Sequence, residues 1–124
     1  MKNSGKELTK AEEQVMQVLW DLENGFVKDI LENLPAPKPA YNTVSTIVRI
    51  LESKDFVGYE AFGKSHRYFP KISKEAYAQQ ITDRLVKGYF GGSIEKMLSF
   101  FVEKKNMSIS DLDELLNNLK KEKE

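Results

Sequence analysis

Cysteine is absent from the 124-residue chain, and histidine occurs once, at His66. The first absence excludes disulfides, thiolate metal sites and cysteine nucleophiles, and the second excludes a histidine-rich metal site. Apolar runs such as Phe100-Phe101-Val102 fall far short of the ~20 residues that a membrane-spanning helix needs. The first six residues are polar and hold no apolar signal-peptide core. We therefore expect no metal, no cofactor, no membrane insertion and a cytoplasmic protein.

No arrangement of residues typical of an active site is evident. His66 has no recognisable Asp partner, and no hydroxyl or lysine nucleophile has a local base. Gly91-Gly92 indicates a helix break rather than a phosphate-binding loop. The acid pairs Glu12-Glu13 and Asp113-Glu114 fall on expected solvated helix faces. We therefore expect no catalytic residues and no enzymatic activity.

Net charge is zero, with nineteen basic and nineteen acidic residues, but the charges are unevenly spread. Residues 1–37 hold four basic and seven acidic residues, whereas residues 38–72 hold six basic and three acidic ones. A positive segment in a neutral chain is either an ordinary solvated surface or a surface for a polyanion. Charge alone leaves both open.

Helical patterns fill the first part of the chain. Apolar residues at helical spacing over 11–22, 27–34 and 44–51 predict three helices. Thr9 and Glu12 have the spacing of a capping box at the start of the first helix, and Asn24-Gly25 is expected to end it. The prolines at 35, 37 and 39 end the second helix, so the third begins near residue 40 or 41.

The third helix, about 41–53, carries short hydrogen-bonding side chains opposite its apolar stripe, where a helix facing water normally carries Glu and Lys. Two aromatic-rich strand patterns follow at 56–62 and 66–69, and Gly63-Lys64-Ser65 joins them as a turn. Pro70 ends the second strand. Three helices and a hairpin in this order predict a winged helix-turn-helix with a wing at about 57–69.

Three amphipathic helices are predicted after residue 72, with breaks at Gly91-Gly92 and before Ser108 or Ser110. Their apolar faces are large for a segment that would be marginal alone, so we expect a homodimer through it. Docking onto the chain's own winged domain is the alternative. The predicted fold is mostly α with a small β wing: a winged domain at 1–72 and a helical dimerisation domain at 73–124. The expected dimer contacts are Tyr77, Ile81, Leu85, Met97, Leu98, Phe101, Leu112, Leu115, Leu116 and Leu119.

A polar helix face beside a basic hairpin tip is suited to duplex DNA. Short side chains reach base edges, Arg49 reaches a phosphate or a guanine, and Lys64 reaches a phosphate. Tyr41 either hydrogen-bonds a phosphate or packs at the helix start. The alternative is a winged-helix module that contacts protein and does not bind DNA specifically. The expected DNA-binding residues are Tyr41, Asn42, Thr43, Ser45, Thr46, Arg49, Lys64, Ser65 and Arg67.

The chain resembles the penicillinase and methicillin-resistance repressors of the BlaI/MecI type from about Leu8 to Leu119. The segments that carry the resemblance are 8–12, 18–20, 41–48, 52–57, 67–70 and 90–93. The resemblance implies a bacterial transcriptional repressor that dimerises through three C-terminal helices and binds a palindromic operator.

In the antibiotic-resistance members, the resemblance further implies a membrane sensor that triggers cleavage of an Asn–Phe bond in the fifth helix. That bond corresponds to Phe100-Phe101 here, so the Asn is replaced. The family's usual Arg near the end of the recognition helix is Ile50, and its usual Gly after that helix is Asp55, which tolerates left-handed geometry less well. Without C-terminal cysteines, the chain cannot sense copper as the copper-responsive branch does.

Overall fold

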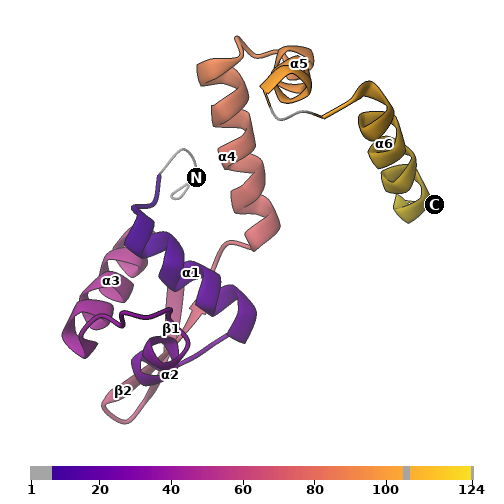
Figure 1. The fold of residues 1–124 in the computed structure, drawn as a ribbon. Helices are drawn as coiled ribbons and strands as arrows, with labels where there is room; N and C mark the ends of the chain where they lie inside the picture. The colour runs from indigo at the N-terminus through magenta and orange to yellow at the C-terminus, as the bar shows by residue number, and fades with distance from the viewer. Residues whose placement is uncertain (1–6, 105–106, 124) are drawn as a thin grey trace. The chain divides into compact units, whose positions relative to one another are not determined.

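The computed structural model describes residues 7–104 and 107–123 and contains six helices and two strands within them (Figure 1). In chain order these elements are α1 (Lys10–Leu22), α2 (Val27–Glu32), α3 (Tyr41–Ser53), β1 (Val57–Phe62), β2 (Ser65–Pro70), α4 (Lys74–Tyr89), α5 (Ile94–Lys104) and α6 (Ile109–Lys123). The predicted order of three helices, a hairpin and three further helices is confirmed. No helix in these ranges is long and apolar enough to cross a membrane.

The first three helices and the hairpin share one hydrophobic core. The apolar stripe of α3 is inside it, because Val44, Val48 and Leu51 have no exposed surface and Ile47 packs at its edge. Fully buried side chains from α1, α2 and the start of the hairpin complete this core; they are Val15, Met16, Leu19, Ile30, Phe56 and Val57. Burial of one side of α3 leaves its polar side facing outward.

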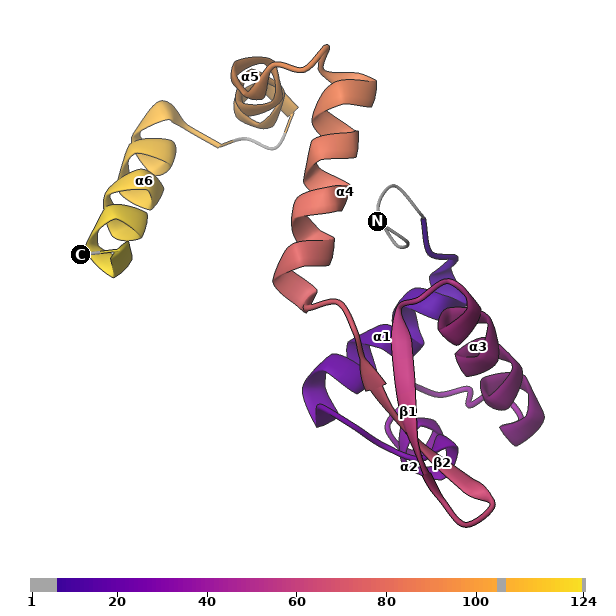
Figure 2. The same cartoon turned by 180° about the vertical axis from the view of Figure 1, so that it is seen from behind.

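The two strands of the hairpin are antiparallel (Figure 2), and their register pairs Phe62 with Ser65 and Val57 with Pro70. Gly63 and Lys64 form its two-residue loop, and Gly63 has φ +62°, as a type II′ turn requires at its first position. Backbone hydrogen bonds also join Gly25 to Tyr68 in both directions, at 2.9 and 2.8 Å. The hairpin is thereby attached to the segment between α1 and α2.

The start of α1 confirms the predicted capping box, since Thr9 and Glu12 exchange side-chain and backbone hydrogen bonds. The helix ends at Leu22, in agreement with the apolar spacing over 11–22, and Glu23 has a positive φ of 72°. Gly25 does not have a positive φ, and its backbone pairs with Tyr68 instead. Because Gly25 and Tyr68 are far apart in the sequence, no local sequence pattern predicts this pairing.

The end of α3 is a Schellman motif. The Phe56 N–H donates to the Leu51 carbonyl at 2.9 Å, and the Asp55 N–H donates to the Glu52 carbonyl at 3.0 Å. Asp55 has φ 67°, the conformation for which Gly is best suited. Its carboxylate accepts a hydrogen bond from Lys71 at 2.6 Å. Asp55 therefore adopts the left-handed turn at this position and connects it to the end of the hairpin.

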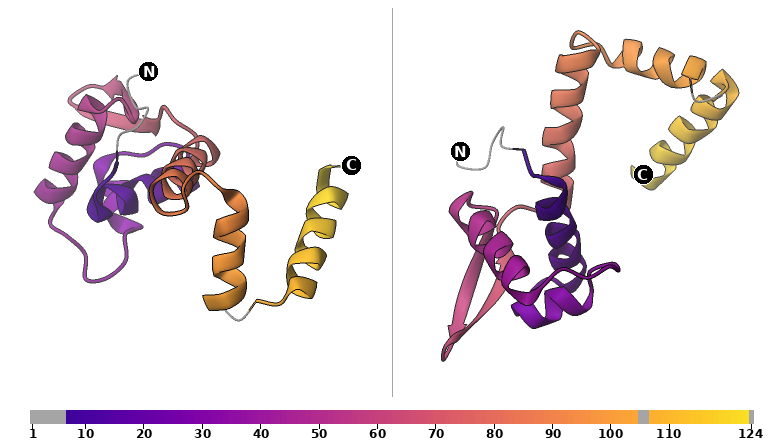
Figure 3. Two further views of the ribbon diagram at one scale, coloured as in Figure 1. Left: turned by 90° about the horizontal axis from the view of Figure 1, so that it is seen from above. Right: turned by 60° about the vertical axis from the view of Figure 1, so that its left-hand side comes forward.

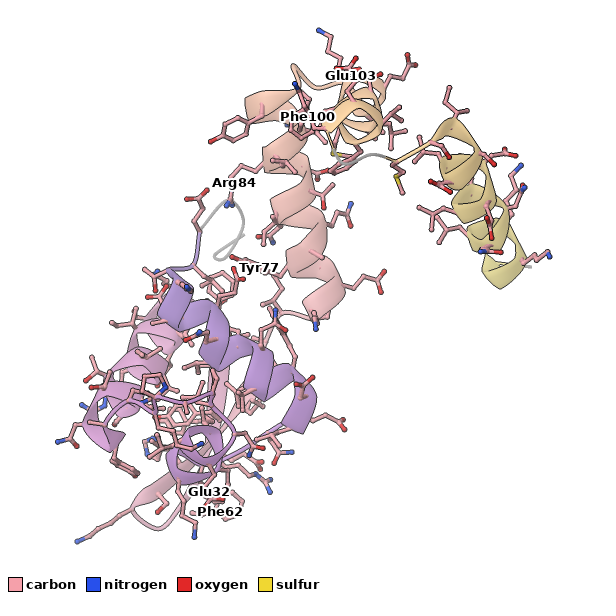
Figure 4. The ribbon with its side chains drawn as sticks, in the orientation of Figure 1. Glu32, Phe62, Tyr77, Arg84, Phe100 and Glu103 are labelled. Atoms are coloured by element: carbon pink, nitrogen blue, oxygen red, sulfur yellow. The ribbon has the colours of Figure 1, made fainter. Side chains whose placement is uncertain are left out.

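Contacts divide the chain into two units, one ending at Gln80 and the other beginning at Ile81, within α4. This division falls later than the boundary expected after residue 72, because the first turn of α4 packs into the winged unit. Tyr77, labelled in Figure 4, is 4% exposed, and its ring lies 5.8 Å from that of Trp20 and 5.7 Å from that of Phe56. The Trp20 indole N–H donates to the Ile72 carbonyl at 2.9 Å. Tyr77 is therefore a core residue of the winged unit and is unavailable as a dimer contact.

The second unit consists of the rest of α4 with α5 and α6 (Figure 3). Serine hydroxyls cap α4 and α5, and Ser108 with Asp111 begins α6, which resolves the choice between Ser108 and Ser110. The predicted break between α4 and α5 is confirmed, with positive φ at Gly91 and Gly92.

Candidate nucleic-acid interface

An open groove separates the start of α3 from the hairpin, and residues of α2 form its third side. Its lining brings together six of the predicted DNA-binding residues. These are Tyr41, Asn42, Ser45 and Arg49 of α3 with Lys64 and Ser65 of the hairpin tip. Residues 26–29 at the start of α2 and Phe62, His66 and Tyr68 of the hairpin complete the lining.

The local sequence explains why α3 presents these groups. Its buried stripe orients Asn42, Thr43, Thr46 and Arg49 toward solvent, and all four are exposed, while Ser45 is half-buried. The Thr46 hydroxyl donates to the Asn42 carbonyl at 3.0 Å, so its donor is used within the helix. Amide, hydroxyl and guanidinium groups on one face of one helix are the groups that read base edges in a major groove.

The groove carries positive charge. Lys28, Arg49 and Lys64 line it together with one carboxylate, that of Asp29. That carboxylate accepts a hydrogen bond from the Phe26 N–H at 2.9 Å. Within residues 7–104 and 107–123, neither Arg49 nor Lys64 has an acidic partner within salt-bridge distance. Their charges are available to an anion such as a phosphate.

Aromatic side chains support the hairpin side of the groove. The rings of Tyr59 and His66 stack at 4.0 Å with an angle of 11° between them, and Tyr68 lies behind them at 6.1 Å from Tyr59. Tyr68 is 5% exposed; burial raises its pKa and Glu52 adds to the effect. The stacked pair holds His66 half-buried on the hairpin, as a structural histidine.

Three predicted residues lie outside the groove. Thr43 and Thr46 are on the other edge of the exposed face of α3. Arg67 shares a face of the hairpin with Ser65 and Phe62, which line the groove, but it is not itself in the lining. Its guanidinium contacts the Glu60 carboxylate at 2.6 Å and lies 4.7 Å from the centre of the Phe62 ring.

Two aromatic residues and one lysine of the groove were missed from the sequence. Phe26 and Phe62 come from segments far apart in the chain, and their rings meet edge to face at 5.8 Å; Figure 4 labels Phe62 on the hairpin. Lys28 is exposed at the start of α2. The helix-turn-helix pattern was the available signal for Lys28, because the helix before the recognition helix crosses the DNA backbone in such domains.

Comparison with known proteins gives a consistent result. The family model described as penicillinase repressor matches residues 8–121. A methicillin resistance regulatory protein MecI of Staphylococcus aureus (strain N315) is 24% identical over 122 residues, covering 98% of this chain and 99% of that protein. A penicillinase repressor of Bacillus licheniformis is 21% identical over 118 residues, covering 94% of this chain and 92% of that protein.

Proposed function

The chain belongs to the penicillinase repressor family, a family of transcriptional repressors, and we propose that it acts as a homodimer that binds a palindromic operator in duplex DNA. In this proposal α3 enters the major groove and the hairpin, residues 57–70, contacts the adjacent backbone as a wing. Its DNA target places its action in the cytoplasm.

The groove between α3 and the wing is the observation that carries the DNA-binding proposal. It places hydrogen-bonding groups of α3 opposite the basic wing tip, so one helix can reach base edges while Lys64 reaches a phosphate. The unpaired positive charges of Arg49 and Lys64 suit the phosphate backbone. Arg67, paired with Glu60, contributes by stabilising the wing.

Exposed apolar residues of the second unit support the dimer. Val86, at 7% exposure, is the one buried hydrophobic residue among the described positions 81–104 and 107–123. A unit with so little core gains stability by burying its apolar faces against a second copy. Of the proposed contacts, Ile81, Leu85, Leu115, Leu116 and Leu119 are exposed, and Met97, Leu98, Phe101 and Leu112 are half-buried.

Two identical subunits related by a twofold axis present two identical recognition helices, which accounts for a palindromic site. Joining the two half-site contacts in one molecule also raises affinity, since the second contact becomes intramolecular.

Selection of bound sequences from random duplexes by the full chain tests the proposal. We expect enrichment of an inverted repeat whose two half-sites are about one helical turn apart or a multiple of it. Arg49→Ala should weaken binding to the selected duplex at least about five-fold, since loss of a good base contact costs about 1–3 kcal/mol.

Lys10→Ala is the matched control, because Lys10 is an exposed base of the same unit that does not line the groove. It should bind like the unmodified chain. Failure to enrich any sequence, or equal binding by Arg49→Ala, would instead favour a winged-helix module that contacts protein.

A further inference from the structure

A second strip of α3 lies apart from the groove and differs from it in chemistry. Thr43, Thr46 and Ile50 have the spacing i, i+3 and i+7, so they follow one another along one side of the helix. All three are exposed, and none lines the groove beside the wing. The outward face of α3 therefore has a polar edge next to the wing and a separate edge formed by these three residues.

The second edge presents mainly apolar groups to a ligand. Ile50 is 39% exposed although Val48 and Leu51, on the same helix, are fully buried. The Ser53 hydroxyl, one turn further on, donates to the Ile50 carbonyl at 2.7 Å, so its donor is turned to the backbone. The Thr46 hydroxyl is likewise used on the Asn42 carbonyl. What remains for a ligand is a row of methyl groups with the Thr43 hydroxyl and the acceptor oxygen of Thr46.

We propose that the strip Thr43–Thr46–Ile50 reads the C5-methyl groups of thymines in the major groove, with Ile50 as a residue that determines sequence specificity. The thymine methyl is the one apolar group that base pairs display in that groove, and small apolar side chains are its usual contacts. Arg49 precedes Ile50 on the helix and anchors it near the DNA surface. This inference rests on the proposed function, because it requires α3 to lie in the major groove.

Replacement of thymine by uracil tests the proposal without altering any hydrogen bond of the base pair. Starting from a duplex that the unmodified chain selects from a random pool, each thymine is replaced in turn by uracil, and affinity is measured at one salt concentration. We expect at least one position in each half-site where the replacement weakens binding about four-fold, which corresponds to the ~0.8 kcal/mol of one buried methyl group.

Three variants assign the effect to the strip. Ile50→Ala should bind the thymine and uracil duplexes equally at the position that Ile50 contacts, and Thr46→Ser, which keeps the hydroxyl, should do the same at a neighbouring position. Arg49→Ala is the matched control, since it should weaken binding to both duplexes and keep their ratio. Urea unfolding verifies that each variant is folded, as expected for exposed positions.

The possible outcomes separate this inference from the function it rests on. If the chain selects an inverted repeat but binds thymine and uracil duplexes equally at every position, the methyl readout is wrong and the repressor function stands. The same conclusion follows if uracil replacement weakens binding of Ile50→Ala as much as it weakens binding of the unmodified chain. Ile50 is then an exposed residue at the edge of the core that does not contact a base. If no sequence is selected, both proposals fail.

Discussion

Lys54, at the end of α3, and Glu12, in the first turn of α1, form an ion pair in which the ammonium nitrogen lies 2.7 Å from the carboxylate oxygen Oε1. Glu12 belongs to α1 and Lys54 follows α3, and the Glu12 side chain is almost completely buried. The same carboxylate accepts from the Thr9 N–H at 3.0 Å. The pair therefore joins the start of α1 to the end of α3.

Replacement of Glu12 by Gln should make stability less dependent on pH. Burial raises the pKa of Glu12, but hydrogen bonds and charge attraction from Lys54, together with hydrogen bonds from Thr9, outweigh it and hold the pKa below its usual value. A lowered pKa stabilises the fold above the unfolded pKa, about 4.3, and this contribution is lost as pH falls through the lower folded value. We expect Glu12→Gln to reduce the free energy of unfolding by about 1–2 kcal/mol at pH 7, and the difference should shrink as pH falls below the unfolded pKa.

Urea unfolding at several pH values and one protein concentration measures this effect. Asp55→Asn is the matched control, because the Asp55–Lys71 pair has the same 2.6–2.7 Å geometry as the Glu12 pair but is more exposed, and Asn tolerates the positive φ. Its cost at pH 7 should be below about 1 kcal/mol. A loss of stability in Glu12→Gln that does not shrink as pH falls would show that it comes from packing instead of charge.

Tyr77→Ala should destabilise the winged unit rather than a dimer. The ring is buried against Trp20 and Phe56, and its removal leaves a cavity in the core. We expect a loss of about 3–5 kcal/mol, as for other large aromatic truncations. Leu85→Ala, at an exposed position of the same helix, should cost far less in the unfolding of the winged unit. Thermal unfolding followed by Trp20 fluorescence distinguishes the two, and equal losses would contradict the assignment of Tyr77.

Leu116→Asp should abolish dimerisation and operator binding together. Leu116 is 52% exposed in the single chain, so the substitution is tolerated there, but in the proposed dimer it buries an unpaired carboxylate at a cost of several kcal/mol. Analytical ultracentrifugation at tens of micromolar, with operator titration on the same samples, measures both losses. Asn117→Asp, on the same helix but off the apolar stripe, is the control and should remain dimeric. An unmodified chain that sediments as a monomer contradicts the proposed dimer.

Lys64→Ala should weaken binding to operator and to random DNA by the same factor, because a phosphate contact carries no sequence information. The slope of log affinity against log salt concentration should fall by about one for each protomer. Arg67→Ala should change the slope less, since Glu60 already contacts its guanidinium and Arg67 does not line the groove. If Lys64→Ala and Arg67→Ala change the slope equally, Arg67 contacts a phosphate in the complex and no longer pairs with Glu60.

The Phe100–Phe101 bond should resist a protease specific for Asn–Phe. Phe100, labelled on α5 in Figure 4, replaces the Asn implied by the family resemblance. The centre of its ring lies 5.5 Å from that of Phe90. Cleavage within a helix also requires local unfolding. Terminal sequencing of the protein recovered from induced cells should show no fragment beginning at Phe101. Phe100→Asn is the informative variant, because cleavage of it alone would show that residue 100 determines the resistance.

The sequence by itself determined the order of the elements and which face of α3 is buried. The stripe of Val44, Val48 and Leu51 allowed one orientation of α3, and that orientation already separated a buried face from a polar one. The capping box at Thr9 and the turn at Gly63 are local signals, so they were also predictable. The family resemblance rested on the same local segments, and the match to residues 8–121 confirmed it.

Only the tertiary structure decided which of these residues act together. Arg67 and Lys64 are close in sequence and equally basic, yet Arg67 is paired with Glu60 and does not line the groove that Lys64 lines. Tyr77 has the spacing of a dimer contact, but contacts with residues more than twenty positions away bury it in the winged unit. Periodicity indicates which side of a helix or strand is buried. It does not indicate which other part of the molecule covers that side, because this depends on long-range packing that a single sequence does not specify.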